Sequence, residues 1–322
     1  MLRRTLLACP ALLAAPFAAP SAARAQGAAI PVVASFTILA DLAREVAGPR
    51  AEIRAIAGPE ADAHAFQPRP SDAASLRGAS LLLRNGLGFD GWFERMLRAG
   101  NYTGPQVVAT TGITPRQMPA HSHGHSHGGG AAERRQNHSV GPRMVADPHA
   151  WQDLRHGVAY VRNIAQGLVR ADAPNAGAYQ AAAATYVTRL EALDGWVRAQ
   201  IATVPEARRK VVTSHDAFGY FGAAYGIEFL APQGISTEAE PSAADVARLI
   251  RLIREQNITA VFLENMGNPA TLQRLAREAG VTVQGRLYAD ALSEPAGPAP
   301  SYEAMFRHNV GLMVAAMRGN PA

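Results

Sequence analysis

Residues 174–203 read PNAGAYQAAAATYVTRLEALDGWVRAQIAT, and this stretch decides how the rest of the chain is arranged. Its apolar residues recur at helical spacings of three, four and seven: Tyr179, Tyr186, Leu190, Leu193 and Val197. One continuous helix of this length would extend roughly 40 Å and would form a stiff rod between the segments on either side. The alternative is a pair of shorter helices that break at Gly195.

Short β-rich runs alternate with helical patterns on both sides of this stretch, as in parallel sheets covered by helices. The strands predicted before it are 31–35, 51–57, 80–84 and 106–110, with helices at 38–47, 71–77 and 91–98. The strands predicted after it are 210–214, 227–231, 260–264 and 281–286, with helices at 218–225, 242–256, 269–279 and 302–317. The sequence therefore predicts an α/β fold of two lobes, each with a four-stranded, mainly parallel sheet flanked by helices, joined by one long rigid α-helix.

The N-terminus has the three parts of a secretory signal peptide. Arg3 and Arg4 give a positive start, an apolar stretch follows from Leu6 to Ala19, and a small-x-small site ends at Ala25. We expect cleavage after Ala25 and a periplasmic product. The chain's one cysteine, Cys9, follows Leu6-Leu7-Ala8 as a lipid-bearing cysteine would, but few apolar residues precede it and the apolar stretch continues beyond it. Lipid attachment there is the less favoured expectation.

The remaining chain is long enough for two domains, and its composition excludes several classes of function. We predict an N-terminal lobe over 26–173, the linking helix over 174–203 and a C-terminal lobe over 204–322. Without the signal peptide, the chain has 28 basic and 26 acidic residues. This near-balance gives no sign of the clustered basic surface that nucleic-acid-binding proteins need. No cysteine would remain for a disulfide or a thiolate site. We expect a monomer.

Four of the ten histidines lie in HSHGHSHGGG (121–130), inside a loop expected over 115–146. His121, His123, His125 and His127 alternate with Ser and Gly, so this segment has little to bury and its neutral imidazoles can bind cations weakly. A solvated linker is the plainer interpretation. We predict secondary metal contacts here.

A second group of side chains follows predicted strands. His64 comes after strand 51–57, His149 after strand 106–110 and the long loop, His215 at the end of strand 210–214, and Asp290 after strand 281–286. The carboxyl ends of parallel strands face one crevice, so two ligands from each lobe would meet between the lobes. Three imidazoles and one carboxylate form a tetrahedral set that suits Zn²⁺.

Neighbouring residues refine this prediction. Ser214 or Asp216 is placed to orient His215, and Pro148 restrains the chain before His149. His156, seven residues after His149, is a competing but less favoured ligand. Whether Asp290 or a water molecule provides the fourth ligand is left open.

Five motifs, in order along the chain, resemble those of the zinc-binding receptors of ABC importers, which belong to the metal-receptor cluster of solute-binding proteins. They are GPEADAHAFQPRPSD (58–72), ADPHAWQD (146–153), VVTSHDAFGYF (211–221), EAEPSAADV (238–246) and YADALSEP (288–295). The resemblance implies two lobes bridged by a rigid helix, metal ligands at His64, His149, His215 and Asp290, and delivery of Zn²⁺ to a membrane permease and its ATPase. Ala63 departs from the proline that this family commonly places before its first histidine. Manganese-type relatives usually have a carboxylate where His215 stands.

Other functions remain to be weighed against zinc capture. A manganese or iron receptor, or an adhesin, would use the same fold. A zinc hydrolase would need an open coordination position and a base such as Glu60, and the sequence has no compact HExxH motif. We therefore predict a binding protein and no enzyme.

Overall fold

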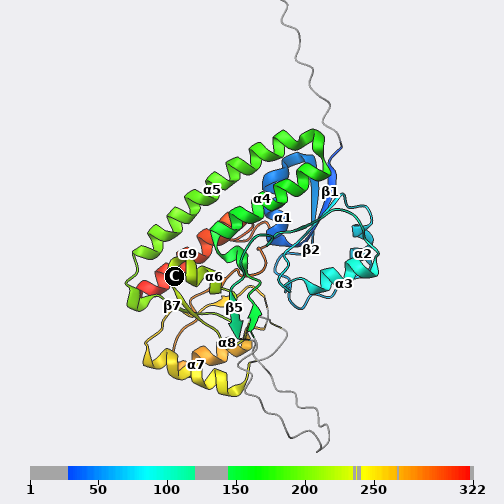
Figure 1. Cartoon of the computed structure of the whole chain (residues 1–322). Helices are drawn as coiled ribbons and strands as arrows, with labels where there is room; N and C mark the ends of the chain where they lie inside the picture. The colour runs from blue at the N-terminus through cyan, green and yellow to red at the C-terminus, as the bar shows by residue number, and fades with distance from the viewer. Residues whose placement is uncertain (1–27, 120–143, 235–236, 238–240, 267, 320–322) are drawn as a thin grey trace, which may run out of the picture.

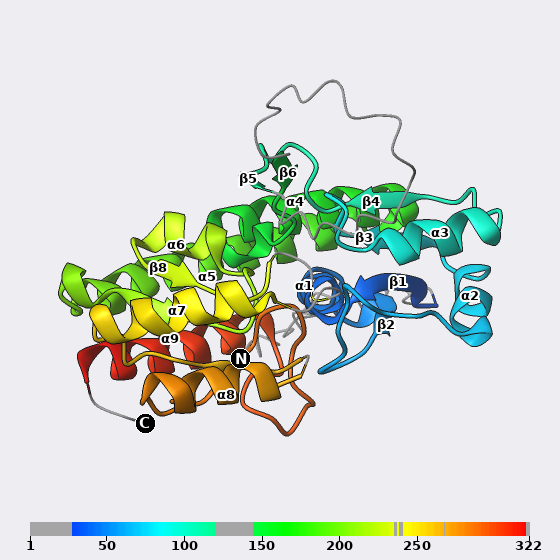
Figure 2. The same ribbon diagram turned by 90° about the horizontal axis from the view of Figure 1, so that it is seen from below.

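The computed structural model describes residues 28–119, 144–234, 237, 241–266 and 268–319. Two α/β lobes lie side by side, with long helices running along both of them (Figure 1). In the view of Figure 2 the N-terminal strands lie at one side of the molecule and helices α7 and α8 at the other. The fold class predicted from the sequence is confirmed.

The N-terminal lobe is built on a parallel sheet with the strand order β2-β1-β3-β4. Its strands are β1 (Ile30–Phe36), β2 (Ala51–Ala57), β3 (Leu81–Arg84) and β4 (Gln106–Val108). The helices between them are α1 (Thr37–Ala47), α2 (Pro70–Leu76) and α3 (Gly91–Ala99). The last five residues of β1 and the first three of β3 are buried, and since successive side chains point to opposite faces, both faces of the sheet are covered here.

The C-terminal lobe has the four predicted strand segments, but they are short. Parallel pairs form between β7 (Lys210–Val212) and β8 (Glu228–Leu230) and between β9 (Leu263–Glu264) and β10 (Arg286–Leu287). A parallel bridge from Val212 to Val261 joins the two pairs. The helices of this lobe are α6 (Gly219–Tyr225), α7 (Ala243–Glu255), α8 (Ala270–Ala279) and α9 (Tyr302–Arg318). The strand expected over 281–286 is therefore wrong for most of its length, since residues before Arg286 are irregular.

Helix α5 (Ala176–Ala202) runs without a break through Gly195 and spans both lobes (Figure 1). It packs against α4 (Leu154–Ala171), α1 and α9. The apolar residues predicted for its buried face are buried: Tyr179, Tyr186, Leu190, Leu193 and Val197. One hydrophobic core continues from the N-terminal sheet through these helices into the C-terminal lobe, while a smaller core lies under α7 and α8. This continuity restrains hinge motion between the lobes.

Helix α4 is absent from the elements predicted from the sequence. It begins after Asp153, whose side chain accepts a hydrogen bond from the backbone N–H of Arg155. Ahead of it, β5 (Gln117–Pro119) and β6 (Met144–Ala146) form an antiparallel ladder that joins the two ends of the predicted 115–146 loop. Within the described part of the chain, every helix is too short or too polar to cross a membrane.

Candidate metal centre

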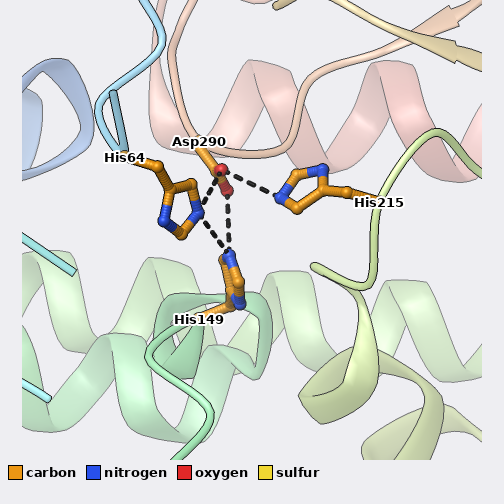
Figure 3. Close-up of side chains that lie close together, drawn as sticks. All are labelled: His64, His149, His215 and Asp290. Atoms are coloured by element: carbon orange, nitrogen blue, oxygen red, sulfur yellow. Dashed lines mark hydrogen bonds and ion pairs between the residues drawn. The ribbon is translucent and has the colours of Figure 1, made fainter. Parts of the chain in front are cut away.

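Four loops carry His64, His149, His215 and Asp290 to one point between the lobes (Figure 3). His64 follows β2, His149 precedes a 3-10 turn (Ala150–Gln152) that leads into α4, His215 follows β7 and Asp290 follows β10. Each loop except that of His149 leaves the carboxyl end of a parallel strand, the edge at which such sheets bind ligands. The structure therefore brings together all four residues singled out in the sequence.

The separations within this cluster fit a single ion at its centre. His64 Nε2 lies 3.1 Å from His149 Nε2 and 3.2 Å from Asp290 Oδ2. Asp290 Oδ2 lies 3.1 Å from His215 Nε2, and Asp290 Oδ1 lies 3.6 Å from His149 Nε2. Tetrahedral bonds of about 2.0 to 2.2 Å place ligand atoms roughly 3.3 to 3.6 Å apart. One candidate atom from each residue lies within 4.8 Å of all the others.

Unsatisfied polar atoms make the case for a cation stronger. Among the residues that the structure describes, the fully buried carboxylate oxygens of Asp290 have no polar partner other than the Nε2 atoms of the three imidazoles, 3.1 to 3.6 Å away. His215 Nε2 is likewise buried and faces Asp290 Oδ2. Buried groups of this kind are costly unless something pairs with them. A divalent cation between them would remove that cost.

Asp147 fixes the orientation of His149. Its Oδ1 lies 2.8 Å from His149 Nδ1 and also accepts a hydrogen bond from the backbone N–H of His149 at 3.0 Å. An imidazole that donates Nδ1–H to a carboxylate presents the lone pair of Nε2. This lone pair then faces the cluster.

Glu264, at the end of β9, plays the same part for His215. Its Oε2 lies 2.5 Å from His215 Nδ1, and its Oε1 accepts hydrogen bonds from the backbone N–H groups of Ser214 and His215. The sequence-based assignment of Asp216 or Ser214 to this role is wrong. Ser214 acts one step away, because its Oγ accepts a hydrogen bond from the backbone N–H of Glu264.

Burial and the neighbouring charges shift the pKa values of the buried ligands in opposite directions. Burial lowers the pKa of His149, but Asp290 and Asp147 outweigh it and raise the pKa to about 9. Burial also acts against protonation of His215, yet Glu264 and Asp290 raise its pKa well above the usual value. Burial raises the pKa of Asp290, while His149 and His215 overcome this and lower its pKa well below the usual value. The buried anions thus hold protons on His149 and His215, and a metal cation must displace them. Burial has the opposite net result at His64, whose pKa is lowered.

Aromatic rings and cross-lobe hydrogen bonds enclose the cluster. Phe89 meets the ring of His64 edge-on at 4.7 Å, and Trp151 meets that of His149 at 5.3 Å. Trp151 Nε1 and Gln152 Nε2 both donate to the carbonyl oxygen of Ala289, the residue before Asp290. The hydrogen bonds tie the loop of one lobe to that of the other, and the aromatic rings pack against two of the ligands.

The other histidines singled out in the sequence lie elsewhere. The His156 ring packs edge-on against Tyr220, with the ring centres 5.2 Å apart, and His156 is not part of the cluster. His121, His123, His125 and His127 lie outside the described residues, so their predicted metal contacts stay predictions. Asp147 and Glu264 were missed as orienting residues. Asp147 had a local signal, a carboxylate two positions before a candidate ligand. Glu264 ends the predicted strand 260–264, but it is 49 positions from His215, and nothing in the sequence pairs the two residues.

Two lobes bridged by a long helix, with three imidazoles and a carboxylate at the ends of their strands, define a metal-binding solute receptor. A family model described as the zinc-uptake complex component A, periplasmic (ZnuA) matches residues 32–316. The chain belongs to this family, the solute-binding proteins of metal ABC importers. It is a binding protein and not an enzyme, and it works outside the cytoplasm with a membrane permease and an ATPase.

Relatives and solved structures agree on the family and differ in the metal they name. The manganese-binding lipoprotein MntA of Halalkalibacterium halodurans is 29% identical over 292 residues, 91% of this chain and 90% of the relative. The iron-binding protein YfeA of Yersinia pestis is 31% identical over 280 residues, 87% of this chain and 83% of the relative. The solved structure of the periplasmic zinc-binding protein TroA from Treponema pallidum matches with a TM-score of 0.78 and 26% identity, covering 90% of this chain and 99% of that chain. A manganese-bound mutant of the periplasmic metal-binding protein from Candidatus Liberibacter asiaticus matches with a TM-score of 0.75 and 25% identity, covering 89% and 99%.

The names of the relatives also correct the expectation for Cys9. The MntA proteins of Halalkalibacterium halodurans and Bacillus subtilis are both named lipoproteins. This finding weighs against the expectation that disfavoured lipid attachment at Cys9, which rested on the short apolar run before Cys9 and the apolar stretch that continues beyond it.

Proposed function

We propose that this chain captures Zn²⁺ outside the cytoplasmic membrane and delivers it to the permease of a zinc importer. The observation that carries the proposal is His215, the third imidazole, which lies 3.1 Å from Asp290 at the centre of the cluster. Nitrogen-rich sites of this kind suit Zn²⁺, whereas Mn²⁺ lies at the weak end of the divalent affinity order and favours oxygen ligands. The cluster offers one carboxylate and three nitrogens.

A manganese or iron receptor is the second candidate, favoured by the names of two relatives, MntA and YfeA. The deciding chemistry is the donor set at the centre. With Glu264 and Asp147 contacting the outer nitrogens, neither of these carboxylates is placed as a direct ligand in the described structure. The residues around the centre therefore support the nitrogen-rich interpretation.

Metal analysis of the purified mature protein, with His215 and with His215→Ala, tests this proposal. We expect the unaltered protein to retain Zn²⁺, and added Zn²⁺ to displace Mn²⁺ completely at equal concentration. The matched control is His156→Ala, which removes an imidazole outside the cluster. Mn²⁺ retained against equimolar Zn²⁺ would support the second candidate instead.

Binding of the metal would connect the ligand loops of the two lobes, while helix α5 keeps the movement of the lobes small. Each ligand loop enters the centre from its own strand or turn, and the continuous core behind them resists a wide opening.

We also propose that the receptor acts as a monomer and that the histidines of 121–127 hold further, weaker ions. Mass spectrometry of the exported protein would show whether processing occurs before a lipid-bearing Cys9 or after Ala25, because the two products differ in mass.

A further inference from the structure

The three histidines of the cluster are not held alike. Buried carboxylates contact Nδ1 of His149 and Nδ1 of His215. Among the residues that the structure describes, no carboxylate contacts Nδ1 of His64. His149 and His215 are therefore each held by a carboxylate at the ring nitrogen that points away from the metal position, and His64 is not.

His64 is also the ligand nearest to solvent. Its side chain keeps 6% of its surface exposed, against 1% or less for the other three. It lines a surface groove of about 320 Å³ together with Phe89, Trp92, Arg95 and Pro148, and none of the other three ligands lines that groove. A water molecule that replaces a ligand would reach the cluster most directly beside His64.

Asp62 holds the His64 loop through its backbone. Asp62 Oδ1 accepts hydrogen bonds from the backbone N–H groups of His64 at 2.9 Å and Ala65 at 3.3 Å. Its other oxygen, Oδ2, accepts a hydrogen bond at 2.6 Å from the hydroxyl of Thr237, in the other lobe. A small polar cavity beside this contact is lined by Asp62, Thr237 and Ser214. The position of His64 thus depends on a bond that crosses between the lobes.

We propose that His64 is the ligand that leaves first and binds last when the cluster exchanges its cation, and that Asp62, tied to Thr237, is a positioning residue that sets the rate of this exchange. The bond from His64 Nε2 to the metal breaks, the imidazole keeps its lone pair, and a water molecule from the groove takes the coordination position. The inference rests on the proposed function, with Zn²⁺ as the probe.

The test is the rate at which Zn²⁺ leaves the full mature protein, followed by stopped-flow mixing with excess chelator. Thr237→Val should speed dissociation about tenfold, the size expected when one hydrogen bond is lost, and Asp62→Ala, which loses three, should speed it at least as much. The association rate should change less than the dissociation rate. Asp62→Asn should stay close to the unaltered protein, because its amide oxygen still accepts from the His64 N–H and its amide nitrogen can donate to the Thr237 hydroxyl.

Two controls separate this role from a general loss of stability. Thr259→Val removes a threonine hydroxyl that donates to the carbonyl oxygen of Ala316, away from the site, and should leave the rate unchanged. In a His64→Ala background, Asp62→Ala should give no further acceleration, because the ligand it positions is absent. Thermal unfolding of the metal-free variants shows whether Asp62→Ala folds, and Thr237→Val carries the test if it does not.

Three results would overturn the inference while the proposed function stands: rates for Asp62→Ala and Thr237→Val equal to that of Thr259→Val, Asp62→Asn as fast as Asp62→Ala, or acceleration by Asp62→Ala without His64. An unaltered protein that retains no Zn²⁺ would instead remove the proposed function, and this inference with it.

Discussion

Asp147 Oδ1 receives two hydrogen bonds from the same residue, one from the ring Nδ1 of His149 and one from its backbone N–H. One oxygen thereby sets both the backbone conformation and the ring orientation of a buried ligand. Its partner oxygen, Oδ2, has no hydrogen bond among the described residues and lies 3.7 Å from Arg116 Nε. The carboxylate is thus committed to positioning and leaves the metal position free.

Asp147→Asn should weaken metal binding by about 10- to 100-fold, the usual loss when the orienting partner of a ligating histidine is changed. The amide can still accept one hydrogen bond, but it no longer supplies the charge that favours Nδ1–H. Isothermal titration against a competing chelator measures the affinity. Asp245→Asn, a change of the same type on the surface helix α7, is the control. Equal affinities for the two variants would exclude an orienting role.

His215→Ala should abolish most of the thermal stabilisation that Zn²⁺ gives. A ligand present at about 1,000 times its dissociation constant stabilises a protein by about 4 kcal/mol, and this contribution disappears as the affinity falls. Differential scanning calorimetry with and without Zn²⁺ measures it. His156→Ala should retain the full shift, since its ring packs on Tyr220. A full shift in His215→Ala would remove His215 from the site.

Removal of residues 121–127 should lower the number of Zn²⁺ ions bound and spare the tightest one. The deletion takes out four histidines but none of the four clustered ligands. Equilibrium dialysis followed by metal analysis gives both the number of ions and the affinity of the tightest. Loss of that tightest ion would contradict the division of the histidines into two groups.

Asp41→Asn should change how stability depends on pH in the metal-free protein. Burial raises the pKa of Asp41 to about 6, although the backbone N–H of Tyr302 donates to its carboxylate. Because the folded pKa lies above the unfolded one, the folded state holds the extra proton, and stability falls as pH rises through about 4 to 6. The asparagine variant lacks this fall and should be more stable than the unaltered protein at pH 7.5 by on the order of 1 to 3 kcal/mol. Urea unfolding across pH measures the difference. A difference that stays constant with pH would refute the assignment.

Gly195→Ala should stabilise the protein by about 0.5 to 1 kcal/mol, because Gly is a poor residue in a helix interior. An added Cβ at Gly195 meets no atom within 4 Å. Gly222→Ala is the contrasting variant in α6, since its Cβ would lie 2.6 Å from the carbonyl oxygen of Ile227. Urea unfolding should show gain for the first and loss for the second. Destabilisation by Gly195→Ala would indicate a break in α5 at that point.

The spacing of apolar residues was sufficient to predict an element where that spacing depends on the element's own buried face. The spacing of Tyr179, Tyr186 and Leu190 predicted α5, because a helix face that must be buried shows in the sequence whatever it packs against. His64, His215 and Asp290 could be found in the same way, since strand ends and the polar residues after them are visible without knowledge of the partner lobe. His149 lies instead before the turn that leads into α4.

Tertiary packing decided the rest. Helix α4 escaped prediction in part because Gly157 and Gly167 weaken its pattern, and the structure explains them. A Cβ at Gly157 would lie 2.6 Å from the Tyr302 hydroxyl, and one at Gly167 would lie 2.3 Å from Val107. Glycine is required at these two positions by contacts with residues distant in the sequence and not by the helix itself.

The amino-acid sequence alone determined the α/β class, the long helix and the identity of the four clustered side chains, since each depends on periodicity or on position after a strand. Only the folded structure decided that Glu264 rather than Ser214 or Asp216 orients His215, and that Asp62 links His64 to Thr237. The physical reason is that hydrogen bonds between residues far apart in the chain depend on which loops the packed lobes bring together. No local sequence pattern specifies how close two such loops lie in the folded protein.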